Sequence, residues 1–191
     1  MQTIAEQIKS GDLSRFQLIY GEEPYMVRYY KNKLKKMLSQ EGDDMNVSSF
    51  EGKGIPLDEV GSLGSTLPFF AEKRLILIEN TELFKSSSEM ADLLEGFPDT
   101  TYVVFVEKKV DKRNRLYKWI QKNGCVTECA LQQERELVPW AARYLKGYGK
   151  SISRKTAEYL IAKIGFQMDG IVNELDKLVG YVGDREEITA E

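Results

Sequence analysis

Two uninterrupted apolar runs constrain the fold of this chain more than any other feature. They are residues 75–78, opened by Arg74, and residues 102–106. A strand with one face in water alternates apolar and polar residues, whereas a strand covered on both faces is apolar throughout. The two runs therefore predict inner strands of a sheet that carries helices on both sides.

Further strand-like segments alternate with amphipathic segments along the first two thirds of the chain. The expected strands are residues 16–20, 45–50, 74–78, 102–106 and 125–129. The expected helices are residues 4–9, 25–38, a segment from Pro56 through Leu63, a segment through 90–94 capped by Ser87 or Ser88, and residues 114–122. Alternation of this kind predicts a mostly parallel, five-stranded α/β sheet.

After Leu131 the pattern changes, because three helical segments follow with no strand between them. They are residues 133–146, 153–164 and 168–179, with Ser153 and Gly165 as cap and stop of the second. Residues 184–191 have the composition of a linker. The sequence predicts an α/β domain followed by a small helical domain.

Composition removes most routes to catalysis and to metal binding. The chain has no histidine, and so lacks the usual general base, metal ligand and partner of a nucleophile. Cys125 and Cys129 are predicted to be buried free thiols. The net charge of −3 gives no global attraction to nucleic acid or to an anionic membrane. No membrane-spanning run or secretion signal is recognisable, so a cytoplasmic location is expected.

A Walker A loop, which cradles phosphates in a nucleotide site, would follow the first expected strand. The chain there reads Gly21-Glu22-Glu23-Pro24, with two carboxylates that repel phosphate and a proline without an amide. Residues 149–151 (GKS) resemble the end of such a loop but follow a helical segment, so a turn is expected. Glu79 follows the third strand without a second acidic residue. The pattern predicts no catalytic, cofactor or metal site.

Four motifs in register resemble the delta subunit of the bacterial DNA polymerase III clamp loader. They are residues 21–25 (GEEPY), 66–80 (TLPFFAEKRLILIEN), 110–113 (VDKR) and 173–178 (NELDKL). The resemblance extends from Leu18 to Leu178. It implies an AAA+-like domain with a degenerate nucleotide site in residues 1–132, a helical lid domain in 133–183, and in 184–191 the start of a linker to a missing collar domain.

What this family does is implied by the same resemblance. Its delta subunits bind the ring-shaped β sliding clamp and help to open it for loading on primed DNA, without hydrolysing ATP. The partners implied are the clamp, the gamma/tau and delta prime subunits through the missing domain, and primed DNA in the complex. No intrinsic catalysis is expected, although the DNA polymerase III holoenzyme is a DNA-directed DNA polymerase.

The predicted clamp-binding residues are Leu67, Pro68, Phe69 and Phe70. The family inserts a hydrophobic pair, often Leu-Phe, that lies before the Arg-led strand, and counting back from Arg74 places this pair at Phe69 and Phe70. Adjacent aromatic residues outside a strand cannot easily face one core, and Pro68 stiffens the segment. The alternative is that Phe69 caps the domain's own core and Phe70 is the sole anchor.

Three rival functions remain open at this level. Residues 108–115 form the one strongly basic run, in which Lys112, Arg113 and Arg115 are candidate DNA contacts, although a solvated helix face fits the same pattern. A degenerate nucleotide hydrolase would rely on Glu79. A purely structural loader subunit would leave the clamp to other chains.

Overall fold

The computed structural model describes residues 2–40, 42–85 and 89–189. The chain divides into two compact units. The first is drawn from Met1–Glu22 and Met26–Cys129, and the second from Glu23–Tyr25 and Ala130–Glu191.

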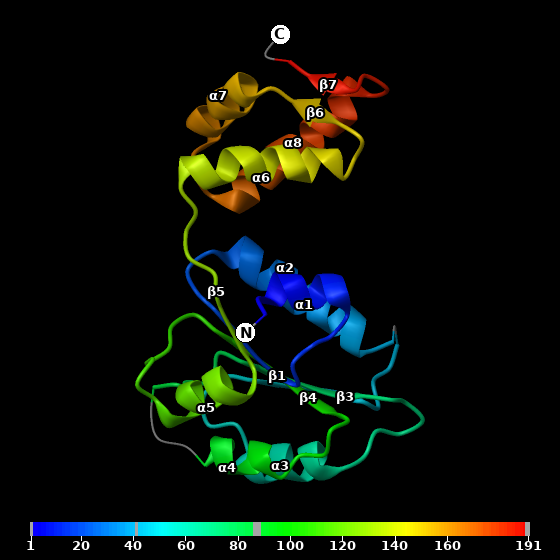
Figure 1. Ribbon diagram of the computed structural model, residues 1–191, viewed down its shortest axis with the longest axis vertical. Coiled ribbons are helices and arrows are strands. Elements are labelled where there is room, and N and C mark those ends of the chain that lie inside the picture. The colour runs from blue at the N-terminus through cyan, green and yellow to red at the C-terminus, as the bar shows by residue number, and fades with distance from the viewer. Residues whose placement is uncertain (1, 41, 86–88, 190–191) are drawn as a thin grey trace. The chain divides into compact units, whose positions relative to one another are not determined.

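The first unit is built on a five-stranded sheet in which all neighbouring strands are parallel (Figure 1). Its order is β2-β3-β4-β1-β5. The strands are β1 Phe16–Tyr20, β2 Val47–Glu51, β3 Arg74–Glu79, β4 Thr101–Glu107 and β5 Cys125–Glu128. The predicted five-stranded parallel sheet is confirmed, and the two uninterrupted apolar runs form β3 and β4, neither of which is an edge strand.

Helices cover both faces of this sheet, as Figure 1 shows. One face carries α1 Ile4–Ser10 and α2 Pro24–Leu38; the other carries α3 Leu57–Ser65, α4 Met90–Glu95 and α5 Arg115–Asn123. Alternate residues of β3 enter the two cores, with Leu75 and Leu77 in the first and Ile76 and Ile78 in the second. Burial on both faces therefore explains the apolar run.

Local chemistry sets the helix boundaries. Pro56 was predicted at the first helical position but precedes α3 as its N-cap residue, in extended backbone. Asn114 likewise caps α5, because its Oδ1 accepts hydrogen bonds from the backbone N–H groups of Leu116 and Tyr117. Ser87 and Ser88, predicted as caps of α4, lie outside the described residues.

The second unit holds three helices, α6 Glu134–Lys146, α7 Arg154–Ile164 and α8 Met168–Val182. Ser153 caps α7 and Gly165 follows it, as predicted. A parallel pair of two-residue strands, β6 Ser151–Ile152 and β7 Glu187–Ile188, was not predicted. Strands this short show no periodicity in the sequence. None of the helices in the described part of the chain has the length and apolar content that crossing a bilayer requires.

Candidate partner-binding site

The carboxyl edge of the sheet, where parallel α/β folds usually bind ligands, is lined with glutamates. Four of the five strands end in one, namely Glu51, Glu79, Glu107 and Glu128. Each is bonded within the first unit: to Asn80 at 3.3 Å, Lys31 at 2.8 Å, Thr81 at 2.8 Å and Lys112 at 2.8 Å, respectively. Two of these carboxylates are paired with lysines and all four are hydrogen-bonded, so they are poorly placed to hold Mg²⁺.

The loop after β1 is closed by the backbone itself. Gly21 has a φ of 142°, and a Cβ on it would lie 2.2 Å from the carbonyl oxygen of Cys129. The amide of Cys129 donates to the carbonyl of Tyr20 at 2.6 Å. At the start of α2, a carboxylate oxygen of Glu23 accepts the amide N–H of Tyr25 at 3.2 Å. An acidic side chain thus takes the place at the helix N-terminus where a phosphate would bind.

The other candidate chemical groups have structural roles. Lys150, in the sequence that resembles a phosphate loop, donates to the carbonyls of Gly183 at 2.6 Å and Arg185 at 2.9 Å. Cys125 and Cys129 are buried, as predicted, and neither forms a disulfide in the described part of the chain. Across residues 2–40, 42–85 and 89–189, no group of three or more His, Cys, Asp and Glu side chains is arranged to hold a metal ion.

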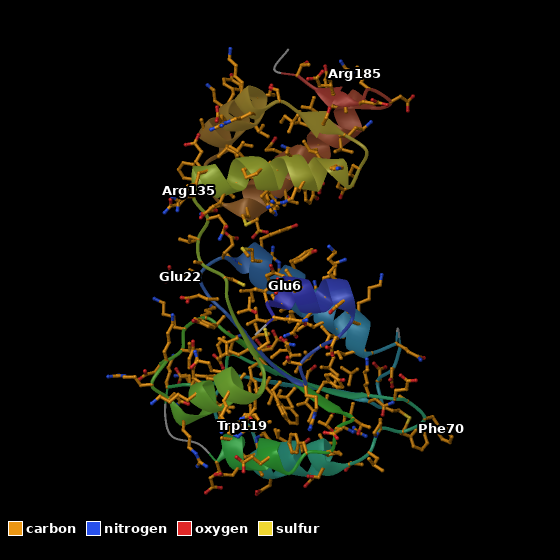
Figure 2. The ribbon with its side chains drawn as sticks, viewed as in Figure 1. Glu6, Glu22, Phe70, Trp119, Arg135 and Arg185 are labelled. Atoms are coloured by element: carbon orange, nitrogen blue, oxygen red, sulfur yellow. The ribbon has the colours of Figure 1, made fainter. Side chains whose placement is uncertain are left out.

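The segment before β3 presents the most exposed aromatic side chain of the described residues. Phe70 is 96% exposed and Phe69 53% exposed, whereas Pro68 is half-buried and Leu67 is exposed. The two rings meet edge to face with centroids 4.5 Å apart. Figure 2 shows Phe70 projecting away from the sheet. Neither ring caps the core, so the structure brings together the aromatic pair that the sequence singled out.

Two buried polar side chains hold the backbone of this segment. The amide group of Asn46 accepts the N–H of Phe69 at 2.6 Å and donates to the carbonyl of Phe69 at 2.9 Å. The guanidinium of Arg74 donates to the carbonyls of Thr66 at 3.0 Å and Leu67 at 3.2 Å. Phe70 adopts a left-handed backbone, with φ of 50°. This conformation is unfavourable for an aromatic residue and needs such support.

The basic run lies at the carboxyl edge and is paired with carboxylates. Lys112 bonds Glu128 at 2.8 Å and lowers the pKa of that carboxyl. Arg113 bonds both carboxylate oxygens of Asp111, which lowers the pKa of Asp111 to about 2. Arg115 bonds Asp92 at 2.9 Å. These pairs reduce the positive potential that a phosphate backbone would meet.

The helix that follows the basic run has the inward stripe that the sequence indicated. Leu116 and Ile120 are buried in the core. Trp119, labelled in Figure 2, packs edge to face on Phe16 at 4.9 Å and donates its Nε1–H to Glu95. The solvated helix face with an apolar inner stripe accounts for this segment without a ligand.

The residues that support the aromatic pair are hard to recognise in the sequence. Asn46 stands between Met45 and Val47, and nothing in that context marks it. Arg74 did carry a signal, because a charged residue that opens a doubly buried strand needs several hydrogen-bond partners. Its role as a support was nevertheless missed.

Comparisons with known proteins identify relatives of the chain. Residues 17–130 match the family described as "DNA polymerase III, delta subunit". The DNA polymerase III subunit delta of Bacillus subtilis is 26% identical over 197 residues, covering 96% of this chain and 57% of that protein. The solved structure of the Bacillus subtilis DNA clamp loader delta protein YqeN has a TM-score of 0.79 and 24% identity, covering 97% of this chain and 59% of its own. This chain therefore spans less than two thirds of both relatives.

Proposed function

Because the chain belongs to the DNA polymerase III delta subunit family, we propose that it binds the β sliding clamp through Phe69 and Phe70 and helps to open the ring. Leu67 and Pro68 complete the proposed contact. Loading of the clamp on primed DNA, in the cytoplasm and together with gamma/tau and delta prime subunits, is the process that this binding would serve. Those partners would be held through a further domain, following the helical lid proposed for residues 133–183.

The observation that carries the proposal is the exposure of two adjacent aromatic side chains on a backbone that Asn46 and Arg74 hold by hydrogen bonds. Exposure of these apolar rings to water is unfavourable, and an apolar pocket on a partner would remove them from water. Aromatic anchors that enter a pocket are typical binding hot spots, often contributing about 2 kcal/mol or more each. Phe69, where the family often has leucine, differs in size and keeps the apolar character.

The mechanism we propose is mechanical and needs no nucleotide on this chain. The carboxyl edge supports the absence of ATP hydrolysis, because Gly21 lies against the Cys129 backbone and the strand-ending glutamates are already bonded. A rigid α/β unit presents the anchor to the clamp, and binding favours the open ring only by the difference in affinity for the open and closed states. Glu79, which the rival hydrolase would use, is instead bonded to Lys31.

The test is the affinity of this chain for the β clamp, measured by calorimetry for the wild type, Phe69→Ala and Phe70→Ala. We expect losses of roughly 30-fold for Phe70→Ala, which corresponds to about 2 kcal/mol, and a smaller loss for the less exposed Phe69. Phe166→Ala is the matched control, because Phe166 is 52% exposed in the other unit. Unchanged affinity in both anchor variants would favour the purely structural subunit.

A further inference from the structure

The amide of Asn46 can adopt only one orientation. Its Nδ2 donates to both carboxylate oxygens of Asp43, at 2.9 and 3.2 Å, and to the carbonyl of Phe69. Its Oδ1 accepts the N–H of Phe69. A flipped amide would set Oδ1 against the carboxylate and Nδ2 against an N–H donor. Asn46, which is 2% exposed, therefore forms hydrogen bonds with both the N–H and the carbonyl of Phe69.

Arg74 joins two segments that are distant in the sequence. Its side chain bonds the carbonyls of Thr66 and Leu67 and, at 3.4 Å, the carbonyl of Met45. Arg74 is 5% exposed and makes no ion pair in the described part of the chain. A buried guanidinium satisfied by carbonyls alone fixes the backbones that carry them. The segments around Met45 and Leu67 are thus held against one side chain.

Met45 is a further exposed apolar residue that could take part in binding. It is 65% exposed, although it directly precedes the buried Asn46. A methionine side chain adapts to irregular apolar pockets and is common on binding surfaces. Since one guanidinium bonds the carbonyls of Met45 and Leu67, the backbone of an exposed methionine from a second segment is held next to the segment of the aromatic pair.

We infer that Asn46 and Arg74 are positioning residues for a two-segment docking surface, in which Met45 joins Leu67, Phe69 and Phe70. The inference rests on the proposed function, since the occupant is the apolar pocket of the β clamp. Holding the left-handed Phe70 backbone before the partner arrives lowers the conformational entropy lost on docking. The hydrogen bonds of the two positioning residues would offset the strain of that backbone.

The positioning role can be tested without the clamp, by amide hydrogen exchange of the free chain followed by NMR. The Phe69 N–H should exchange about tenfold or more faster in Asn46→Ala than in the wild type, because its acceptor is removed. Thr81→Val is the control, since it removes a buried hydrogen bond to Glu107 and leaves the loop contacts in place. Equal exchange of the Phe69 amide in wild type and Asn46→Ala overturns the positioning role.

The docking surface is tested by clamp affinity in a double-mutant cycle. We expect Asn46→Ala to weaken binding about tenfold alone and less than about twofold in a chain that already carries Phe69→Ala and Phe70→Ala. Met45→Ala should weaken binding roughly threefold, whereas Leu131→Ala, which removes another exposed apolar side chain, should bind as the wild type does.

Each contrary outcome identifies what has failed. Full affinity in the Phe69→Ala and Phe70→Ala forms refutes the proposed function, while the exchange experiment still decides the positioning role. If those two variants bind weakly but Asn46→Ala binds normally, the positioning role is refuted. An Asn46→Ala effect that persists in the doubly substituted chain makes Asn46 merely structural. Normal affinity of Met45→Ala removes Met45 from the surface.

Discussion

The two edges of the parallel sheet in the first unit differ in how they use their side chains. At the carboxyl edge, four strand-ending glutamates are bonded by neighbouring side chains, and Gly21 lies against the backbone of Cys129. At the amino edge of β3, buried Asn46 and Arg74 hold a backbone that turns Phe69 and Phe70 outwards.

The difference shows that one sheet can bond its own carboxylates at one edge and display apolar side chains at the other. The edge that holds ligands in most α/β folds satisfies its own charges here and leaves no cradle for a phosphate. At the opposite edge, the buried side chains of Asn46 and Arg74 hold a segment that exposes the aromatic pair, an arrangement that stability alone does not require. Partner binding is therefore expected at the amino edge, and substitutions at the two edges should have different effects.

The largest effect on stability is expected at the amino edge, for Arg74→Met. Methionine has a similar length but leaves three carbonyls without their donor, so the free energy of unfolding should fall by about 3 kcal/mol or more. Arg74→Lys, which keeps the charge but not the planar fork, should lose less. Urea denaturation measures both; a loss under about 1 kcal/mol for Arg74→Met would show that these bonds do not hold the segment.

At the carboxyl edge, Gly21→Ala should destabilise the chain by about 2–3 kcal/mol, because the new Cβ meets the Cys129 carbonyl and the backbone is left-handed. Gly11→Ala is the matched control: its φ is 81° and nothing lies near its Cβ, so strain alone should cost about 1 kcal/mol. Thermal unfolding compares the two. Equal losses would mean that the loop after β1 is not tightly closed.

A smaller, pH-dependent effect is expected from Glu107. Burial raises its pKa above the ordinary value, although hydrogen bonds from Thr81 oppose the shift. The folded state therefore holds the proton more tightly than the unfolded state, and this contribution to stability is lost as pH rises through the folded pKa. Relative to Glu107→Gln, the wild type should become less stable as pH rises from about 4 towards 7. Parallel pH profiles of the two unfolding free energies would contradict this.

The smallest effect is expected for DNA binding by the basic run. Arg113→Glu with Arg115→Glu should change oligonucleotide affinity by less than about twofold, because both arginines already bond carboxylates. Lys33→Glu with Lys36→Glu is the charge-matched control; within the described residues neither lysine forms an ion pair. A tenfold loss confined to the arginine variant, with a weaker salt dependence, would instead assign DNA contact to Arg113 and Arg115.

The sheet was predictable because doubly buried strands leave an uninterrupted apolar signal, as in residues 75–78 and 102–106. The position of the aromatic pair followed from the family resemblance, which places it shortly before the Arg-led strand, with three residues between Phe70 and Arg74. The hydrogen bonds that hold the aromatic pair were not predictable, because Asn46 bonds Phe69 from 23 positions away in the sequence. The pairing of Ser151–Ile152 with Glu187–Ile188 depends on a similar long-range contact, and a single sequence records neither.

Docking of Phe69 and Phe70 on the β clamp is tested most directly by backbone hydrogen–deuterium exchange of this chain with and without the clamp, resolved by peptide. We expect slower exchange on clamp binding in segments 45–46 and 67–71, with no change around Gly21 or in residues 108–115. Protection at the carboxyl edge or the basic run, with none at Phe69 and Phe70, would contradict it.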